Sequence, residues 1–220
     1  MLSKFKLYFI YYLLSFPIVY GIYALNYKNL NLPNIPIVQI VLAIISIIFI
    51  RIFGKNWILF NKIKNVRVVF YLTFGLLVLF FINNYFIIIY DEIVTWRVKY
   101  KEIAISSILL HYILSSTSEE IIYRGFIQNY INNNLVKKED TLITKGNWIA
   151  TSIMAFIHLG FFAYFNLFFA ITSFILVILF SLISGYIMDK TKNIFIPITI
   201  HILVNFIHYF TCIGVMNNYF

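Results

Sequence analysis

Long apolar runs separated by short polar segments make up most of this 220-residue chain. A hydrocarbon slab about 30 Å thick is crossed by about 20 apolar residues at 1.5 Å rise, so runs of this length predict membrane-spanning helices. The predicted spans cover residues 6–25, 35–53, 66–90, 103–135, 148–165, 167–188 and 194–215. The fourth run is longer than a bilayer requires and contains a Ser/Thr cluster, and a break there would give eight spans. The pattern predicts an all-α transmembrane bundle of about seven spans.

Composition supports a polytopic membrane protein. The chain is 62% hydrophobic and 11% charged, whereas a soluble domain has about 45–50% apolar and about 25% charged residues. No linker or repeat divides the sequence, so a single membrane domain over residues 1–220 is expected, located in the cell membrane.

The net charge of +9 would suggest a nucleic-acid partner in a soluble protein. In membrane proteins Lys and Arg collect in cytoplasmic loops, and this interpretation is preferred here, with the lipid bilayer as partner and no nucleic acid. With seven spans and a cytoplasmic N-terminus, twelve of the 17 Lys and Arg lie in inner segments and four in outer ones. The count predicts a cytoplasmic N-terminus and an external C-terminus.

Ionisable residues within membrane helices are costly and mark candidate functional sites. The fourth run contains the sequence SEEIIYRGF at 118–126. Glu120 and Arg124 are four residues apart, so they share a helix face and are expected to form a structural ion pair. Glu119 points elsewhere and has no local cation. A carboxylate beside another carboxylate in apolar surroundings is a candidate general acid or base near neutral pH.

Histidines in later spans are expected to meet this acidic pair. His158 lies within the fifth predicted span, and His201 and Asn205 lie four apart in the seventh. At 1.5 Å per residue, these residues and Glu119 are all about 10–20 Å from the cytoplasmic ends of their helices. Their similar depth predicts one shared site.

Two routes to water activation fit these residues. In one, Glu119, His158 and His201 hold a divalent metal such as zinc, which acidifies a bound water. In the other, Glu119 with His158 takes the proton of the water, while His201 and Asn205 stabilise the oxyanion. The sequence lacks HExxH, so it does not require a metal. Either route predicts hydrolysis of a carbonyl substrate inside the membrane.

Three motifs in order resemble those of the CAAX prenyl protease and bacteriocin-processing (Abi) family of intramembrane endopeptidases. They are EExxxR at 119–124, a motif ending at His158, and HxxxN at 201–205. The second motif is FxxxH in the family, and Met154 stands here in place of its Phe. The resemblance covers residues 103–210, the expected catalytic core.

The resemblance implies an endopeptidase that cleaves a peptide or a membrane-attached, prenylated-type substrate. Glu119 and His158 would activate the water, and His201 and Asn205 would stabilise the oxyanion. The second glutamate and the arginine of EExxxR would hold their helix in place. Bacterial members are linked to bacteriocin maturation or self-immunity. The alternatives are a non-catalytic bacteriocin immunity or binding protein and a proton-linked transporter, which would predict internal repeats.

Overall fold

The structure is a computed structural model that describes residues 9–10, 12–13, 37–54, 57, 59–62, 66–89, 105–136, 141–164 and 166–216. Over these residues the chain is helical apart from short connections and one isolated bridge between Phe60 and Asn193. The long helices are α2 (Ile37–Phe53), α3 (Val66–Ile89), α5 (Ile105–Glu120), α6 (Lys145–Ile157), α8 (Leu167–Thr191) and α9 (Phe195–Met216). The predicted all-α fold is confirmed.

The structure supports a helical membrane protein but not the predicted count of seven spans. Among the described residues, two helical stretches are long and apolar enough to cross a bilayer, Val66–Phe86 and Leu167–Thr191. Ile37–Phe53 and Phe195–Thr211 are apolar but shorter. Helix α6 has 13 residues, which reach only about 20 Å; the 3₁₀ turn η3 (His158–Gly160) and the short helix α7 (Phe161–Tyr164) continue it almost to the end of the predicted fifth span. The predicted span at 6–25 lies outside the described residues except for positions 9–10 and 12–13.

One continuous helical segment occupies the long fourth run. Helix α5 continues without interruption into the π-helix η1 (Ile121–Gln128), and a second π-helix, η2 (Ile131–Leu135), follows two residues later. The alternative of a break at the Ser/Thr cluster is therefore wrong. Asn129 Nδ2 donates to the Arg124 carbonyl (2.6 Å), so an amide side chain adds a hydrogen bond to the backbone carbonyls of this wider helix.

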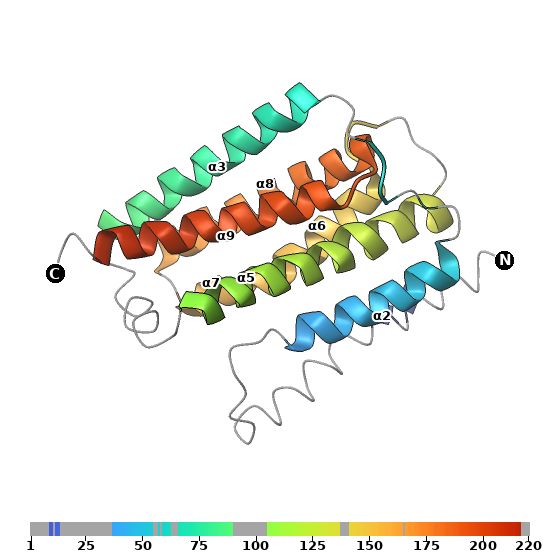
Figure 1. Cartoon of the computed structure of the whole chain (residues 1–220), viewed down its shortest axis with the longest axis horizontal. Coiled ribbons are helices and arrows are strands. Elements are labelled where there is room, and N and C mark those ends of the chain that lie inside the picture. Colours follow the sequence, from blue (N-terminus) through green and yellow to red (C-terminus); the bar gives the residue numbers. More distant parts are fainter. Residues whose placement is uncertain are drawn as a thin grey trace, which may run out of the picture.

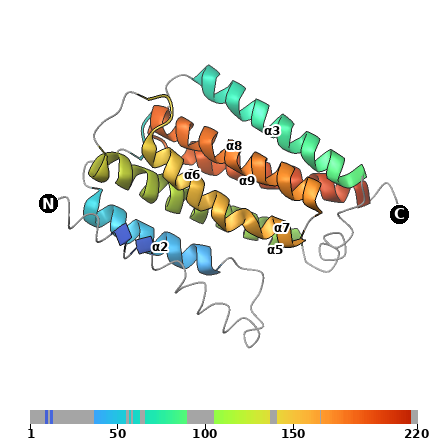
Figure 2. The same cartoon turned by 180° about the vertical axis from the view of Figure 1, so that it is seen from behind.

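Neighbouring helices cover most of this central segment, while Leu110 and Ile113 of α5 stay exposed. Helix α2 covers α5 and η1 on one side, α9 packs along α5 on the other, and α6 packs against η1 and α8. Helix α3 lies at the opposite edge from α2, against α8 and α9 (Figures 1 and 2). The core includes Phe126, Ile127 and Tyr130, whereas Phe70 and Tyr71 of α3 are exposed. An apolar outer face of this kind suits contact with lipid.

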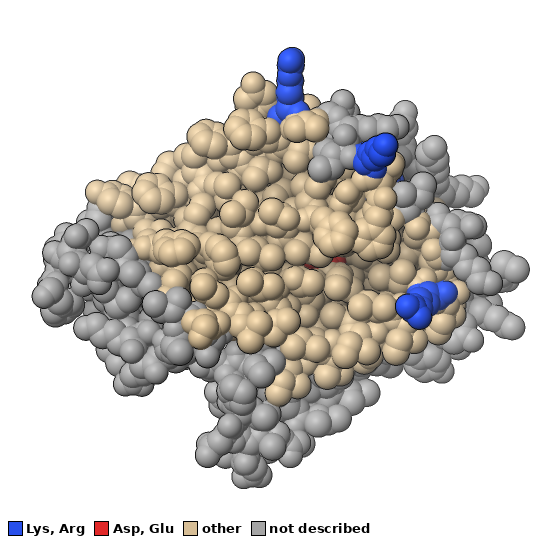
Figure 3. Space-filling view, viewed as in Figure 1, with Lys and Arg blue, Asp and Glu red and all other residues tan. Residues whose placement is uncertain are grey.

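Three polar segments meet at one end of the bundle. Asn61 N donates to the Lys192 carbonyl (3.0 Å), and Ile194 N donates to the Leu59 carbonyl (2.8 Å). Thr144, which caps α6, donates to Asp189 of α8 (2.8 Å). These segments belong to the loops predicted to be cytoplasmic. Described Lys and Arg side chains lie toward this end in Figure 3, on a face that is otherwise almost uncharged.

Candidate active site

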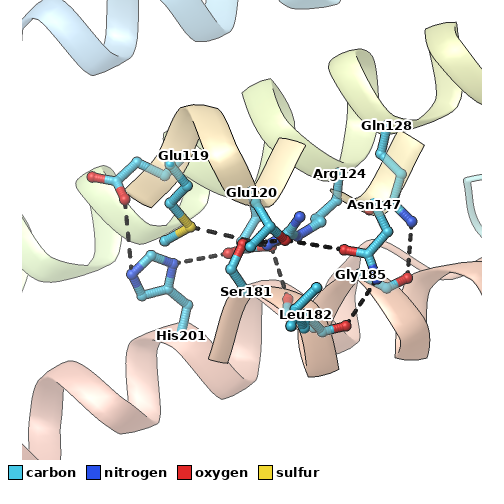
Figure 4. Close-up of polar contacts among 12 residues, drawn as sticks. Glu119, Glu120, Arg124, Gln128, Asn147, Ser181, Leu182, Gly185 and His201 are labelled. Carbon is cyan, nitrogen blue, oxygen red and sulfur yellow. Dashed lines mark hydrogen bonds and ion pairs between the residues drawn. The ribbon is translucent and has the colours of Figure 1, made fainter. Parts of the chain in front are cut away.

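The two adjacent glutamates end helix α5, and the arginine of the same motif lies in η1. The side chains of Glu120 and Arg124 are completely buried, with Arg124 Nε 3.4 Å from Glu120 Oε2. The predicted ion pair is therefore present (Figure 4). Glu119 differs because 17% of its side chain remains exposed. A small acidic area is visible in the middle of the face shown in Figure 3.

His201 of α9 lies between the two carboxylates. Its Nδ1 donates to Glu120 Oε1 (3.0 Å), and its Nε2 is 3.9 Å from Glu119 Oε2 (Figure 4). The first contact is a hydrogen bond, while the second is too long to be one. When one ring nitrogen of a histidine is held, the other nitrogen has a defined direction. Glu120 therefore fixes the ring so that Nε2 faces Glu119.

Three groups surround the Glu120 carboxylate. Besides Arg124 and His201, the Ser184 hydroxyl of α8 donates to Oε2 (3.1 Å). Glu120 and Ser184 are both fully buried. A buried carboxylate is strongly unfavourable unless it is paired and hydrogen-bonded. The surroundings of Glu120 meet this need with residues from three different segments of the chain.

Arg124 is held by a row of polar side chains between α6 and α8. Its Nη2 donates to Ser181 Oγ (2.5 Å) and lies 3.9 Å from Met154 Sδ. The hydroxyl of Ser181 donates to Thr151 (3.0 Å), which in turn donates to Asn147 Oδ1 (3.2 Å). Met154 is the residue that replaces the Phe of the family motif, and its thioether gives the guanidinium a weak acceptor that a Phe ring lacks.

Close approach of α6 and α8 makes these contacts possible. Asn147 Nδ2 of α6 donates to the Leu182 carbonyl of α8 (2.9 Å), and Gln128 Nε2 of η1 donates to the Gly185 carbonyl of α8 (2.9 Å; Figure 4). A Cβ atom at Gly185 would lie 2.1 Å from Asn147 Oδ1. Glycine is therefore needed at this position because the Asn147 amide occupies the space of a side chain.

Asn205 lies one turn beyond His201 on α9. Its Nδ2 donates to the Ser116 hydroxyl (2.9 Å), which is buried in α5 one turn before the glutamates. Together with the His201–Glu120 bond, this contact fixes the register between α5 and α9. The structure thus brings Glu119, Glu120, Arg124 and His201 together, with Asn205 next to them.

His158 is not joined to this cluster. It lies where α6 ends, and its Nδ1 donates to the Met154 carbonyl of its own helix (2.8 Å). Among the described hydrogen bonds and ion pairs, none links it to Glu119 or His201. Within the described part of the chain no three His, Cys, Asp or Glu side chains could hold a metal ion. Glu119, His158 and His201 are therefore not arranged as a metal-ligand set, and a metal requirement stays a prediction.

Two further histidines lie in spans but match no motif. His208 Nδ1 donates to Asn84 Oδ1 of α3 (3.2 Å), which links α9 to α3. The His111 ring packs edge-on against Tyr112. The first contact joins two helices, whereas the second lies within α5.

Sequence reasoning missed the hydroxyl groups that contact the site residues or support those contacts. They are Ser116, Thr151, Ser181 and Ser184. A signal was present, because Ser181, Ser184 and Gly185 recur at spacings of three and four within an apolar run and so share one helix face. Small polar residues on one face of a membrane helix are typical of a helix–helix interface.

An apolar helical bundle that buries a Glu–Arg–His cluster defines a membrane protein with a charged internal site. The family model described as type II CAAX prenyl endopeptidase Rce1-like matches residues 101–207. Through this segment, which contains the whole cluster, the chain belongs to the CAAX protease family, and the resemblance seen in the motifs is confirmed. Searches of curated proteins and of solved structures gave no match.

Proposed function

We propose that this protein is an intramembrane endopeptidase that hydrolyses a peptide bond in a prenylated or otherwise membrane-attached substrate. The observation that carries the proposal is the placement of His201, held by buried Glu120 and facing the partly exposed Glu119. Membership of the CAAX protease family supports peptidase activity. The motif neighbours thus have different roles: Glu120 orients and Glu119 reacts.

In this mechanism the reaction is assigned to the space between Glu119 Oε2 and His201 Nε2, which are 3.9 Å apart. A water that bridges these two atoms would lie beside the pair, at about 2.8 Å from each. Glu119 takes a proton from this water as the oxygen attacks the peptide carbonyl carbon. His201 Nε2, protonated, donates to the oxyanion, and Asn205 assists with its amide. Glu119 then returns the proton to the leaving amine as the C–N bond breaks.

This assignment differs from the sequence-based one in a single pairing. The sequence pattern pairs Glu119 with His158, whereas the proposal pairs it with His201, whose Nε2 is 3.9 Å from Glu119 Oε2. No step is assigned to a metal, because the described carboxylates and histidines do not form a ligand set. Metal analysis of purified, active protein tests this part of the proposal.

The proposed arrangement in the membrane has seven spans, a cytoplasmic N-terminus and an external C-terminus. It is supported by the meeting of segments 59–61, 144 and 189–194 at one end of the bundle. These segments belong to the Lys- and Arg-rich loops that the charge count places inside. The physiological substrate is proposed to be a small peptide, as in bacteriocin processing or self-immunity.

The test is a cleavage assay with full-length protein in liposomes, using one fluorescence-quenched peptide with and without a prenyl group. Glu119→Gln is expected to lower kcat about 10²–10⁴-fold, because a positioned general base contributes about that much. His201→Ala should be similarly inactive, while both variants accumulate normally in the membrane. His111→Ala is the matched control for the histidine substitution and should keep wild-type activity.

Full activity of both Glu119→Gln and His201→Ala would disprove the catalytic assignment. A wild-type protein that cleaves neither peptide but still confers bacteriocin resistance on cells would identify the alternative, a non-catalytic immunity protein.

A further inference from the structure

Helix α8 contributes a buried hydroxyl to the carboxylate that orients His201. The two oxygens of Glu120 have different partners: Oε1 accepts from His201, and Oε2 accepts from Ser184 Oγ at 3.1 Å. Arg124 Nε is 3.4 Å from Oε2, which is longer than a normal N–H···O hydrogen bond. Among the described contacts of Oε2, the hydrogen bond from the Ser184 hydroxyl is therefore the shortest.

Because its two oxygens bind different partners, the Glu120 carboxylate has one fixed orientation. With Oε2 held by Ser184, the other oxygen faces His201 Nδ1. Without the hydroxyl, the carboxylate can rotate so that both oxygens approach the guanidinium of Arg124, because a bidentate Arg–carboxylate pair is the preferred geometry. That rotation would withdraw Oε1 from the imidazole. The direction of His201 Nε2 toward Glu119 would then no longer be fixed.

We propose that Ser184 is a positioning residue for the hydrolytic reaction: its hydroxyl holds Glu120 so that Glu120 orients His201. Among the described hydrogen bonds, Ser184 reaches Glu120 and neither Glu119 nor His201, so it acts through Glu120. This inference rests on the proposed peptidase function for its kinetic part. Its structural part, the orientation of His201, stands independently of that function.

The experiment compares Ser184→Ala with Ser115→Ala in the full-length protein. Ser115 is also buried, but its hydroxyl donates only to the Tyr112 carbonyl of its own helix among the described contacts. Ser184→Ala is expected to lower kcat about tenfold, the lower end of the range for losing a hydrogen-bond partner that orients a metal-ligating side chain, since Ser184 likewise acts through the residue that it holds. KM should stay within twofold of wild type, and Ser115→Ala should change neither constant.

A second measurement follows His201 directly. Nuclear magnetic resonance of protein labelled with ¹⁵N-histidine reports the two ring nitrogens, and the His201 signals are identified by their loss in His201→Ala. The Nδ1 signal is expected to shift in Ser184→Ala and to stay unchanged in Ser115→Ala. A merely structural role of Ser184 would lower the amount of folded protein without moving this signal in the folded fraction.

The outcomes separate the two proposals. Wild-type kcat or an unmoved His201 signal in Ser184→Ala overturns the positioning role. A wild-type protein without peptidase activity overturns the proposed function, and the resonance comparison alone then decides whether Ser184 holds His201 through Glu120.

Discussion

Two neighbouring carboxylates in this protein have opposite surroundings. Glu120 is completely buried and is contacted by Arg124, Ser184 and His201. Glu119 keeps 17% of its side chain exposed and approaches His201 at 3.9 Å without a hydrogen bond. A fully hydrogen-bonded carboxylate is rigid and poorly suited to exchange protons, whereas a partly exposed one can reach water and substrate. At the scale of residues, burial distinguishes the orienting acid from the reacting one.

Replacement of the buried arginine tests this distinction by stability. Arg124→Met should lower the free energy of unfolding by about 3–5 kcal/mol, because it leaves the Glu120 carboxylate buried without its cation. The measurement is thermal unfolding in detergent, together with the amount of protein in the membrane. Arg51→Met is the control, since Arg51 is exposed on α2. The double variant Glu120→Gln/Arg124→Met should recover part of the loss. If Arg124→Met is as stable as the control, the pair does not stabilise the fold.

The positions of these residues could be predicted only in part. Counting residues along a span predicts depth, and it correctly suggested that His201 would meet the glutamates. It gives no direction around the helix axis, and it assumed one regular helix through the fifth span. The run is helical to Tyr164, but the α-helix α6 gives way at His158 to the 3₁₀ turn η3, and the His158 ring bonds back to the Met154 carbonyl. The hydroxyls of α8 were missed because serine in an apolar run has no charge to mark it.

At the scale of elements, the junction of α6 with α8 determines how closely the site is held. Asn147 lies directly over Gly185, and the polar row from Asn147 to Arg124 runs along this contact.

The extents of most helices followed from the apolar runs; α2, predicted at 35–53, occupies Ile37–Phe53. The π-helical geometry of η1 did not follow from the sequence, because a π-helix is a local widening of an α-helix and the apolar run is the same for both.

A methyl group at this junction should separate the two helices. Gly185→Ala is expected to destabilise the protein by about 1–3 kcal/mol, because the new Cβ would lie 2.1 Å from Asn147 Oδ1. Gly75→Ala is the matched control, since a Cβ there meets nothing within 4 Å. Thermal unfolding of both variants, and of Gly185→Ala combined with Asn147→Ala, measures the coupling. Strictly additive effects would show that Asn147 and Gly185 do not contact each other.

At the scale of the whole molecule, polar segments gather at one end of an apolar bundle. The bridge between Phe60 and Asn193 joins two loops that are more than 100 residues apart in the sequence, and Asn193 Nδ2 donates to the Asn61 carbonyl (2.7 Å). Such contacts require the loops to lie on the same side of any membrane that surrounds the bundle. Charge counting predicts which side this is, and the prediction can be tested by chemical labelling.

Single introduced cysteines would show which side of the membrane each loop faces. The background is Cys212→Ser, since Cys212 is the only cysteine in the sequence. Lys62→Cys and Leu142→Cys, both at exposed positions near the polar end, should react with a membrane-impermeant maleimide only in inside-out vesicles. Leu167→Cys, at the start of α8, should react only in intact cells. Labelling of Lys62→Cys and Leu142→Cys from opposite sides would contradict the arrangement.

The hydrogen bond between His201 and Glu120 also has a consequence for biogenesis. The two residues are 81 positions apart, and a ribosome adds about 5–20 residues per second, so the carboxylate is made roughly 4 to 16 s before its histidine. Ser184 is likewise synthesised later. Throughout that interval Arg124, which lies on the same helical segment, is already synthesised and can pair with Glu120. The ion pair therefore neutralises the acid during insertion, when a lone carboxylate in lipid would be most costly.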